Sequence, residues 1–228
     1  STNLMGGAIQ GTELSLSTAV TTFAGSSSGN TDATGTSASF NWPHGITTDG
    51  TNLYVADYGN HRIRKIVIDN GTVTTLAGSS LGSADNATGT SASFNNPMGI
   101  TTDGTNLYVA DYGNHRIRKI VIDNGTVTTL AGSSSGSADN ATGTLASFQF
   151  PREITTDGTN LYVTDKNNHR IRKIVIDNGT VTTLAGSSSG NTDATGTSAS
   201  FNNPQGITTD GTNLYVSDTN NNRIRKIE

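Results

Sequence analysis

The sequence predicts an all-β protein made of repeated four-stranded units, and three observations support this. A 34-residue string stands letter for letter at 45–78 and at 99–132 and returns with a few changes at 153–186, and its first 23 residues return, again with a few changes, at 206–228. Each copy holds short apolar segments separated by Gly, Asn and Asp turn signals. The equivalent residues Asp49, Asp103, Asp157 and Asp210 stand 54, 54 and 53 residues apart. Four strands per unit at such a period are typical of a β-propeller, in which neighbouring units stack on each other.

The turn chemistry divides each copy into strands. In the second copy the four expected strands are residues 100–102, 106–110, 116–122 and 126–131. A tight Asp103-Gly104 turn joins the first two, and Asn124-Gly125 supplies a primed turn between the last two. The unbroken apolar run from Leu107 to Val109 indicates a sheet covered on both faces, so we expect Leu107 to be buried. Each unit is therefore expected to form an antiparallel meander.

The copies also predict the domain organisation. Residues 1–16 lie outside the repeat and are expected to be an N-terminal extension, whereas 17–228 form a single propeller domain. The blades are approximately 45–78, 99–132, 153–186, and 206–228 together with 17–25. The last pairing is expected because STAVTTFAG at 17–25 matches the fourth-strand string GTVTTLAG, while the last copy shows only three strands. We therefore expect four four-stranded blades, with the last blade closed by the N-terminal strand, in a monomer. A dimer that exchanges these strands is the alternative.

Connectors of small polar residues separate the copies. A phenylalanine recurs near the end of each connector, as Phe40, Phe94, Phe148 and Phe201. We expect these rings to be wedges packed between adjacent blades rather than ligand contacts.

One decapeptide carries a resemblance to a known family. The strings are DYGNHRIRKI at 57–66 and 111–120, DKNNHRIRKI at 165–174, and DTNNNRIRKI at 218–227. They closely resemble the NHL repeats of a family of β-propellers, and the long connector ending in Phe-x-x-Pro-x-Gly is similar to that of bacterial members. The resemblance covers nearly the whole chain after about residue 17. It implies a propeller scaffold, and such scaffolds carry unrelated functions.

Composition excludes several classes of function. The chain has no cysteine, so disulfides, thiol chemistry and Cys-type zinc sites are excluded. The formal net charge is −4, and twelve of the fourteen basic residues lie in the R-x-R-K string of the third strand. We expect these to be structural, the first Arg of each set facing the Asp five residues earlier. The sequence therefore predicts no nucleic-acid partner. It also contains no membrane span.

Candidate site residues are found where near-identical copies differ. The differences fall just before the first strand and in the turn between the second and third strands. In an antiparallel meander both places emerge on one side of the sheet, so we expect a variable rim. The candidate ligand-binding residues of this rim are Trp42, His44, Tyr58, Tyr112, Phe150, Arg152 and Lys166. Their residue types suit recognition, although drift of an unused surface gives the same pattern.

Catalytic and metal-binding constellations are sparse. His61, His115 and His169, with His44, could in principle converge on a metal, but the NHL resemblance places a His after Asn in a turn away from the axis. The Asp residues at 57, 111, 165 and 218 are interpreted as turn caps. We therefore expect no catalytic residue, no metal and no cofactor.

The residues favour a non-catalytic binding or scaffold propeller that presents the variable rim to a protein or glycan, exported or envelope-associated in a bacterium. One alternative is a metal-assisted propeller enzyme of the lyase or lactonase type, which needs a locally unique polar cluster at the axis. Another is a fragment, or a laboratory-made piece, of an amplified repeat protein with no specific ligand.

Overall fold

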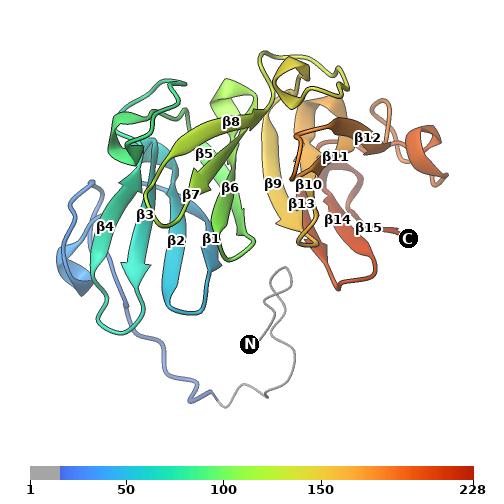
Figure 1. Cartoon of the computed structure of the whole chain (residues 1–228). Coiled ribbons are helices and arrows are strands. Elements are labelled where there is room, and N and C mark those ends of the chain that lie inside the picture. Colours follow the sequence, from blue (N-terminus) through green and yellow to red (C-terminus); the bar gives the residue numbers. More distant parts are fainter. Residues whose placement is uncertain (1–15) are drawn as a thin grey trace.

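The computed structural model describes residues 16–228 and is all-β, with antiparallel sheets that follow one another as the four blades of a β-propeller (Figure 1). The predicted fold class and the four blades are confirmed. The helical segments of this part of the chain are three-residue 3-10 turns, so no helix within 16–228 is long enough to cross a bilayer.

Blade 1 contains β1 (Pro43–Thr48), β2 (Asn52–Asp57), β3 (Arg62–Val67) and β4 (Val73–Ala77). Blade 2 contains β5 (Pro97–Thr102), β6 (Asn106–Asp111), β7 (Arg116–Val121) and β8 (Val127–Ala131). Blade 3 contains β9 (Pro151–Thr156), β10 (Asn160–Asp165), β11 (Arg170–Val175) and β12 (Val181–Ala185). Blade 4 contains β13 (Pro204–Thr209), β14 (Leu214–Asp218) and β15 (Arg223–Ile227). The 3-10 turns are η1 (Gly35–Ser37), η2 (Tyr58–Asn60), η3 (Gly89–Ser91), η4 (Tyr112–Asn114), η5 (Gly143–Leu145), η6 (Lys166–Asn168), η7 (Gly196–Ser198) and η8 (Thr219–Asn221).

The strands agree closely with the turn chemistry of the sequence. In blade 2 the second to fourth strands differ from their predicted bounds by one residue at most. β5 begins at Pro97, three residues before the predicted start, because Pro97 pairs with Asp111 beyond a shift in register before Ile100. Each blade thus gains a short extension that carries the chain onto the rim.

The core lies between the blades. β1 packs against β5, β5 against β9, and β9 against β13. One cluster of buried residues joins blades 1 and 2 and includes Ile63, Phe94 and Leu107, each fully buried. The predictions of a Phe wedge and of a buried Leu107 are therefore confirmed. Burial of such side chains stabilises the fold by roughly 1.5–3 kcal/mol each.

The buried charges follow a different pattern from the one expected. Asp57 forms its 2.8 Å ion pair with Arg64, the second Arg of its set, and both side chains are buried. Arg62 stands opposite Asp57 in the strand pairing, as expected, but its guanidinium donates to carbonyl oxygens of the connectors and forms no ion pair with Asp57. Only Arg64 lies under the connector, where it also donates to Asp32 and lies over the Phe40 ring. The repeated Asp is therefore the acceptor of a buried ion pair, and the prediction that it caps its own turn is wrong.

The prediction that the N-terminal strand closes the last blade is wrong for this chain. Blade 4 has three strands among the described residues, in the order β13-β14-β15, and residues 17–25 form no strand. The Gly25 N–H donates to the Gly35 carbonyl (3.1 Å), so this segment ends beside blade 1. No packing comparable to that between the other blades joins β13 to β1 in the described part of the chain. A strand beside blade 1 therefore cannot reach β15.

Figure 1 shows the consequence, with blades 1 and 4 at opposite ends of the row. The predicted N-terminal extension, 1–16, lies outside the described residues except for Leu16, and the proposed domain bounds stay predictions.

Candidate functional site: the variable rim

The two variable connections of each blade lie together at one end of the sheet. In blade 1 the Gly59 N–H donates to the Asn41 carbonyl (2.8 Å), and the Asn41 N–H donates to Asp57 Oδ1 (2.8 Å). Corresponding bonds occur in the other three blades. Asp57, which forms the buried ion pair with Arg64, therefore also holds the connector against the turn through its hydrogen bond to Asn41. The rim residues predicted from sequence do lie on one edge, as the meander required.

In each blade, the residue before the proline that begins the first strand adopts a left-handed backbone. Trp42, Asn96, Phe150 and Asn203 have φ values of 52°, 53°, 57° and 52°. Asn tolerates this conformation, whereas for a bulky side chain it is a true outlier that costs about 1–2 kcal/mol. Blades 1 and 3 thus hold an aromatic residue where blades 2 and 4 hold an unstrained one. Strain of this kind is the observation from which a functional hypothesis starts.

The first aromatic cluster belongs to blade 1. The rings of Trp42 and Tyr58 are stacked with centroids 6.3 Å apart, and His44 lies 5.1 Å from Tyr58. Trp42 remains 74% exposed although it is the largest side chain of the rim. An exposed indole beside a half-buried phenol offers an apolar face with polar edges.

The second aromatic cluster joins blades 2 and 3. The Phe150 ring lies 4.8 Å from Tyr112 and 4.6 Å from His115, centroid to centroid. The Lys166 ammonium lies 5.9 Å from the Tyr112 centroid, within the range of a cation–π contact. The rim therefore presents two aromatic groups, each with a nitrogen-bearing side chain at its edge.

The histidines of the turns have a structural task that sequence reasoning missed. The backbone N–H groups of Asn96, Phe150 and Asn203 each donate to Nδ1 of the preceding blade's turn histidine, at 3.1 Å. These histidines are His61, His115 and His169, and each has a left-handed backbone. Nδ1 of each histidine therefore accepts a hydrogen bond from the next blade, and we call this contact a histidine clasp. Among residues 16–228, no three metal-ligating side chains gather at one point.

The axial strands are less uniform than the sequence suggested. Glu153 on β9 stands where the other blades have glycine, and its carboxylate lies over Gly99, where an added Cβ would be 2.8 Å from Oε1. Burial raises the pKa of Glu153, and Arg152 acts against that shift. Burial and the charge of Arg152 both lower the pKa of His44. The positive charge of Arg152, in β9 of blade 3, therefore acts on His44 in β1 of blade 1.

Glu153 was visible in the sequence as a break in the glycine pattern, but a single letter did not show that it enters the axis. Its N–H donates to Thr164 Oγ1 (2.9 Å), and Thr164 Oγ1 in turn donates to the Gln205 carbonyl of blade 4. Blade 3 therefore carries a locally unique polar group. A single partly buried carboxyl of this kind does not by itself form a general acid and base pair.

Comparisons with known proteins agree with the geometry. The family model described as NHL repeat matches residues 40–66, 94–120 and 201–227. A chicken protein described as NHL repeat-containing protein 2 is 27% identical over 244 aligned residues, which cover 91% of this chain and 34% of that protein. The counterpart from cattle is 34% identical over 144 residues, or 57% of this chain and 19% of that protein. The chain thus spans about a third or less of the length of these relatives.

A solved structure from Bacteroides ovatus, described as an auxiliary nutrient binding protein, is similar with a TM-score of 0.66 at 23% identity, covering 84% of this chain and 49% of that one. At this identity the likeness shows the fold alone. The matched repeats begin at the wedge phenylalanine and run through the buried Arg to the end of the third strand, which are the parts of the unit that hold the blades together. The chain is therefore a β-propeller that carries NHL repeats at these three places.

Proposed function

We propose that this protein is a non-catalytic binding propeller whose variable rim holds an extended ligand, either a glycan or a protein segment. The single observation that carries the proposal is the placement of Trp42 and Phe150 in a left-handed backbone where the equivalent residues are Asn. A bulky residue at such a position has a cost to folding, so a role outside folding accounts for its presence. The solved neighbour described as a nutrient binding protein is consistent with a binding role.

The chemistry of the rim supports this assignment. Two aromatic groups flanked by Arg152, Lys166 and His44 combine apolar faces with hydrogen-bond donors, as the anchors of recognition surfaces do. The groups belong to different blades, so a ligand that touches both must be extended. We include in the proposal that the protein is exported or envelope-associated in a bacterium. Fractionation of source cells tests that part.

The test is a pair of measurements on variants of the rim. Glycan-array screening and a pull-down provide the ligand, and its affinity is then measured with Trp42→Ala, Phe150→Ala and Arg152→Ala. Loss of such an anchor costs about 2 kcal/mol or more, which is on the order of thirtyfold in Kd. Asn203→Ala is the matched control at the equivalent position of blade 4 and should leave Kd unchanged.

Trp42→Asn separates binding from folding. Asn accepts the left-handed backbone, so we expect this variant to be at least as stable as the wild type while losing affinity. If Trp42→Ala and Arg152→Ala leave every measured affinity unchanged, the variation is drift and the repeat-protein alternative stands. If they unfold the protein instead, the residues belong to the core.

The enzyme alternative is centred on Glu153. Its carboxyl is the one acidic group at this axial position among the four copies. We propose no reaction for it, because among residues 16–228 its carboxylate accepts a hydrogen bond from the neighbouring Ile154 N–H and from no group placed for proton transfer. If the protein hydrolyses a lactone or a phosphate ester, and if Glu153→Gln abolishes this activity, the enzyme hypothesis is supported instead.

A further inference from the structure

Two cations of blade 3 stand at the variable rim without a carboxylate partner. Twelve of the fourteen basic residues belong to the R-x-R-K strings, and the other two are Arg152 and Lys166. The equivalent residues of the other blades carry no permanent charge: they are His44, Met98 and Gln205 for Arg152, and Tyr58, Tyr112 and Thr219 for Lys166. The ion pairs among residues 16–228 are made by the second Arg of each string and by Lys226. Arg152 and Lys166 therefore keep their charges available to a ligand.

The first Arg of each string adds positive charge to the same end of the blades. Arg116 begins β7 directly after the turn at η4, and Arg170 begins β11 directly after the turn at η6. Each guanidinium donates to two serine carbonyl oxygens of the connectors, at 3.0–3.4 Å. These neutral acceptors satisfy N–H groups but leave the charge in place. The rim end of blades 2 and 3 is thus positive, although the chain as a whole has a formal net charge of −4.

The acidic groups of this end are withdrawn into the core or toward the axis. Asp111 and Asp165 are fully buried and form ion pairs of 2.8 and 2.7 Å with arginines of their own blades. Glu153 turns its carboxylate over Gly99, and burial raises its pKa. These acids therefore do not form a negative surface beside Arg152 or Lys166.

His115 adds a donor whose tautomer is fixed by the histidine clasp. Its Nδ1 accepts the Phe150 N–H at 3.1 Å, so the neutral ring carries its proton on Nε2. Burial lowers the pKa of His115, which keeps the ring neutral at pH 7. The Phe150 ring stands edge-on to this imidazole at 71°, and Tyr112 lies on its other contact. The second aromatic cluster thus combines ring faces with the donors of His115, Lys166 and Arg152.

The other two histidine clasps lack this combination. The clasps of His61 and His169 hold Asn96 and Asn203, in place of Phe150. Neither Asn is followed two residues later by a cation, since Met98 and Gln205 stand there. An aromatic ring, a fixed imidazole donor and two unpaired cations therefore coincide at the clasp between blades 2 and 3.

This set of groups fits a ring that has an apolar face and a negatively charged substituent. Hydrogen bonds from cations to anionic oxygens are about twice as strong as neutral ones. The C–H face of a sugar ring packs on the negative face of an aromatic ring. The N–H groups of Gly113 and Asn167, in the two turns, already donate to connector carbonyls at 2.8 and 3.1 Å. A peptide therefore finds side-chain donors here but no strand edge to extend.

We propose that the ligand of the variable rim is an acidic glycan, and that the second aromatic cluster holds a sugar ring bearing a carboxylate or a sulfate. The sugar ring lies on Phe150 and Tyr112. Its anionic group accepts hydrogen bonds from Lys166, Arg152 and His115 Nε2. The inference rests on the proposed function and names the class of ligand for the same surface.

Titration calorimetry with matched saccharides tests the charge. The first arm compares an oligomer of galacturonate with its methyl ester, which keeps the ring and the linkage but removes the charge. The second arm compares a sulfated galactose oligomer with its neutral counterpart, so the two arms distinguish carboxylate from sulfate. We expect the acidic member of at least one arm to bind about tenfold or more tightly than its neutral match. Raising NaCl from about 0.05 M to about 0.5 M should remove most of this difference.

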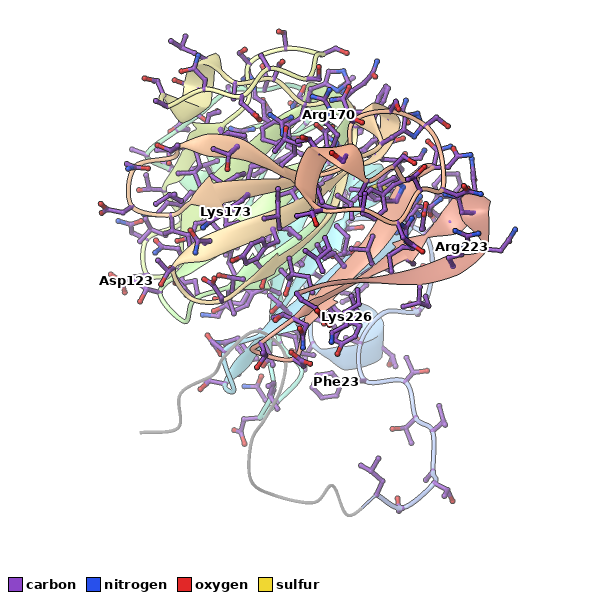
Figure 2. The ribbon with its side chains drawn as sticks, turned by 90° about the vertical axis from the view of Figure 1, so that its right-hand side faces the viewer. Phe23, Asp123, Arg170, Lys173, Arg223 and Lys226 are labelled. Atoms are coloured by element: carbon purple, nitrogen blue, oxygen red, sulfur yellow. The ribbon has the colours of Figure 1, made fainter. Side chains whose placement is uncertain are left out.

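Charge-removing variants assign the effect to blade 3. Arg152→Met and Lys166→Met should each weaken binding of the acidic saccharide about tenfold and leave binding of its neutral match unchanged. Lys173→Met is the matched control, because Lys173 is a half-buried lysine of the same blade. It lies in β11 opposite Tyr162 and Thr182, and Figure 2 shows it apart from Arg170 at the start of that strand. This control should leave both affinities unchanged.

The outcomes separate this inference from the proposed function. If neutral and acidic saccharides bind equally well and Phe150→Ala abolishes both, the rim is a binding site but the charge inference is wrong. If a hexapeptide of glutamate binds more tightly than every acidic saccharide, the ligand is a protein segment and the inference is also wrong. If no acidic saccharide binds, the inference fails, while the pull-down still tests the rim for a protein ligand.

Discussion

Blades 1 and 2 contain the same 34 residues, at 45–78 and 99–132, yet the two copies are buried differently. Every residue of β5 is buried, whereas no residue of β1 is fully buried. Within residues 16–228, blade 2 has a neighbouring blade on both sides, whereas blade 1 has one only on the side of blade 2. The difference teaches that in a stacked repeat the local sequence determines the strand, while the neighbouring blade determines whether its apolar face leaves water.

The largest expected effect compares the buried ion pairs of an inner and an outer blade. Arg118→Ala should cost about 3–5 kcal/mol of unfolding free energy, because Asp111 is left charged and buried without its partner. Arg225→Ala in blade 4 also leaves a buried carboxylate, Asp218, without its partner, but it should cost less, since Arg225 is 8% exposed and its second partner Asp193 is 84% exposed, so that water can reach the site. Chemical denaturation of both variants measures the difference. Equal costs would show that blade 4 is as enclosed as blade 2.

The next comparison uses the two identical copies themselves. Ile100→Ala should cost about 2–5 kcal/mol, because it leaves a cavity between blades 1 and 2. Ile46→Ala, the same change at the same letter of the repeat, should cost less than about 0.5 kcal/mol in a dilute monomer. The two denaturation midpoints, compared at low protein concentration, give the measurement. A large cost at Ile46 that grows with concentration would indicate a covering partner.

The smallest expected effect concerns pH and compares the three histidine clasps with blade 4, which has Asn222 instead. Burial lowers the pKa of His61, His115 and His169 below 6.5. The unfolded chain therefore takes up these protons at a higher pH than the folded chain does. Their contribution to stability is complete above pH 6.5 and is lost as the pH falls from there through the folded-state pKa values.

We accordingly expect a modestly lower melting temperature at pH 5.5 than at pH 7.5. A triple variant, His61→Asn, His115→Asn and His169→Asn, should show a weaker pH dependence in this window. Glu153, whose pKa is raised by burial, acts in the opposite sense but is present in both proteins, so its effect cancels in the comparison. An unchanged pH dependence in the triple variant would contradict the clasp.

The candidate site was predictable as a place but not as a set of contacts. The alternation of an antiparallel meander predicts that both variable connections share one edge, and the structure agrees. The left-handed backbone at Trp42 and Phe150 was not predicted, because bulky side chains disfavour this conformation, which Asn tolerates at the equivalent positions 96 and 203. The edge-to-face contact of Phe150 with His115 depends on a hydrogen bond between two blades.

The sequence by itself determined the repeated strands, their turns, the wedge phenylalanines and the propeller class, because these follow from local backbone preferences and from the period of the copies. Only the tertiary structure decided that Arg64 rather than Arg62 pairs with Asp57, since the choice depends on which side chain the connector covers. The same holds for the closure of blade 4: residues 17–25 have the letters of a fourth strand, but strand pairing needs a partner edge within hydrogen-bonding distance. Two identical sequences can therefore have different environments, because burial is a property of the arrangement of the blades and not of the letters.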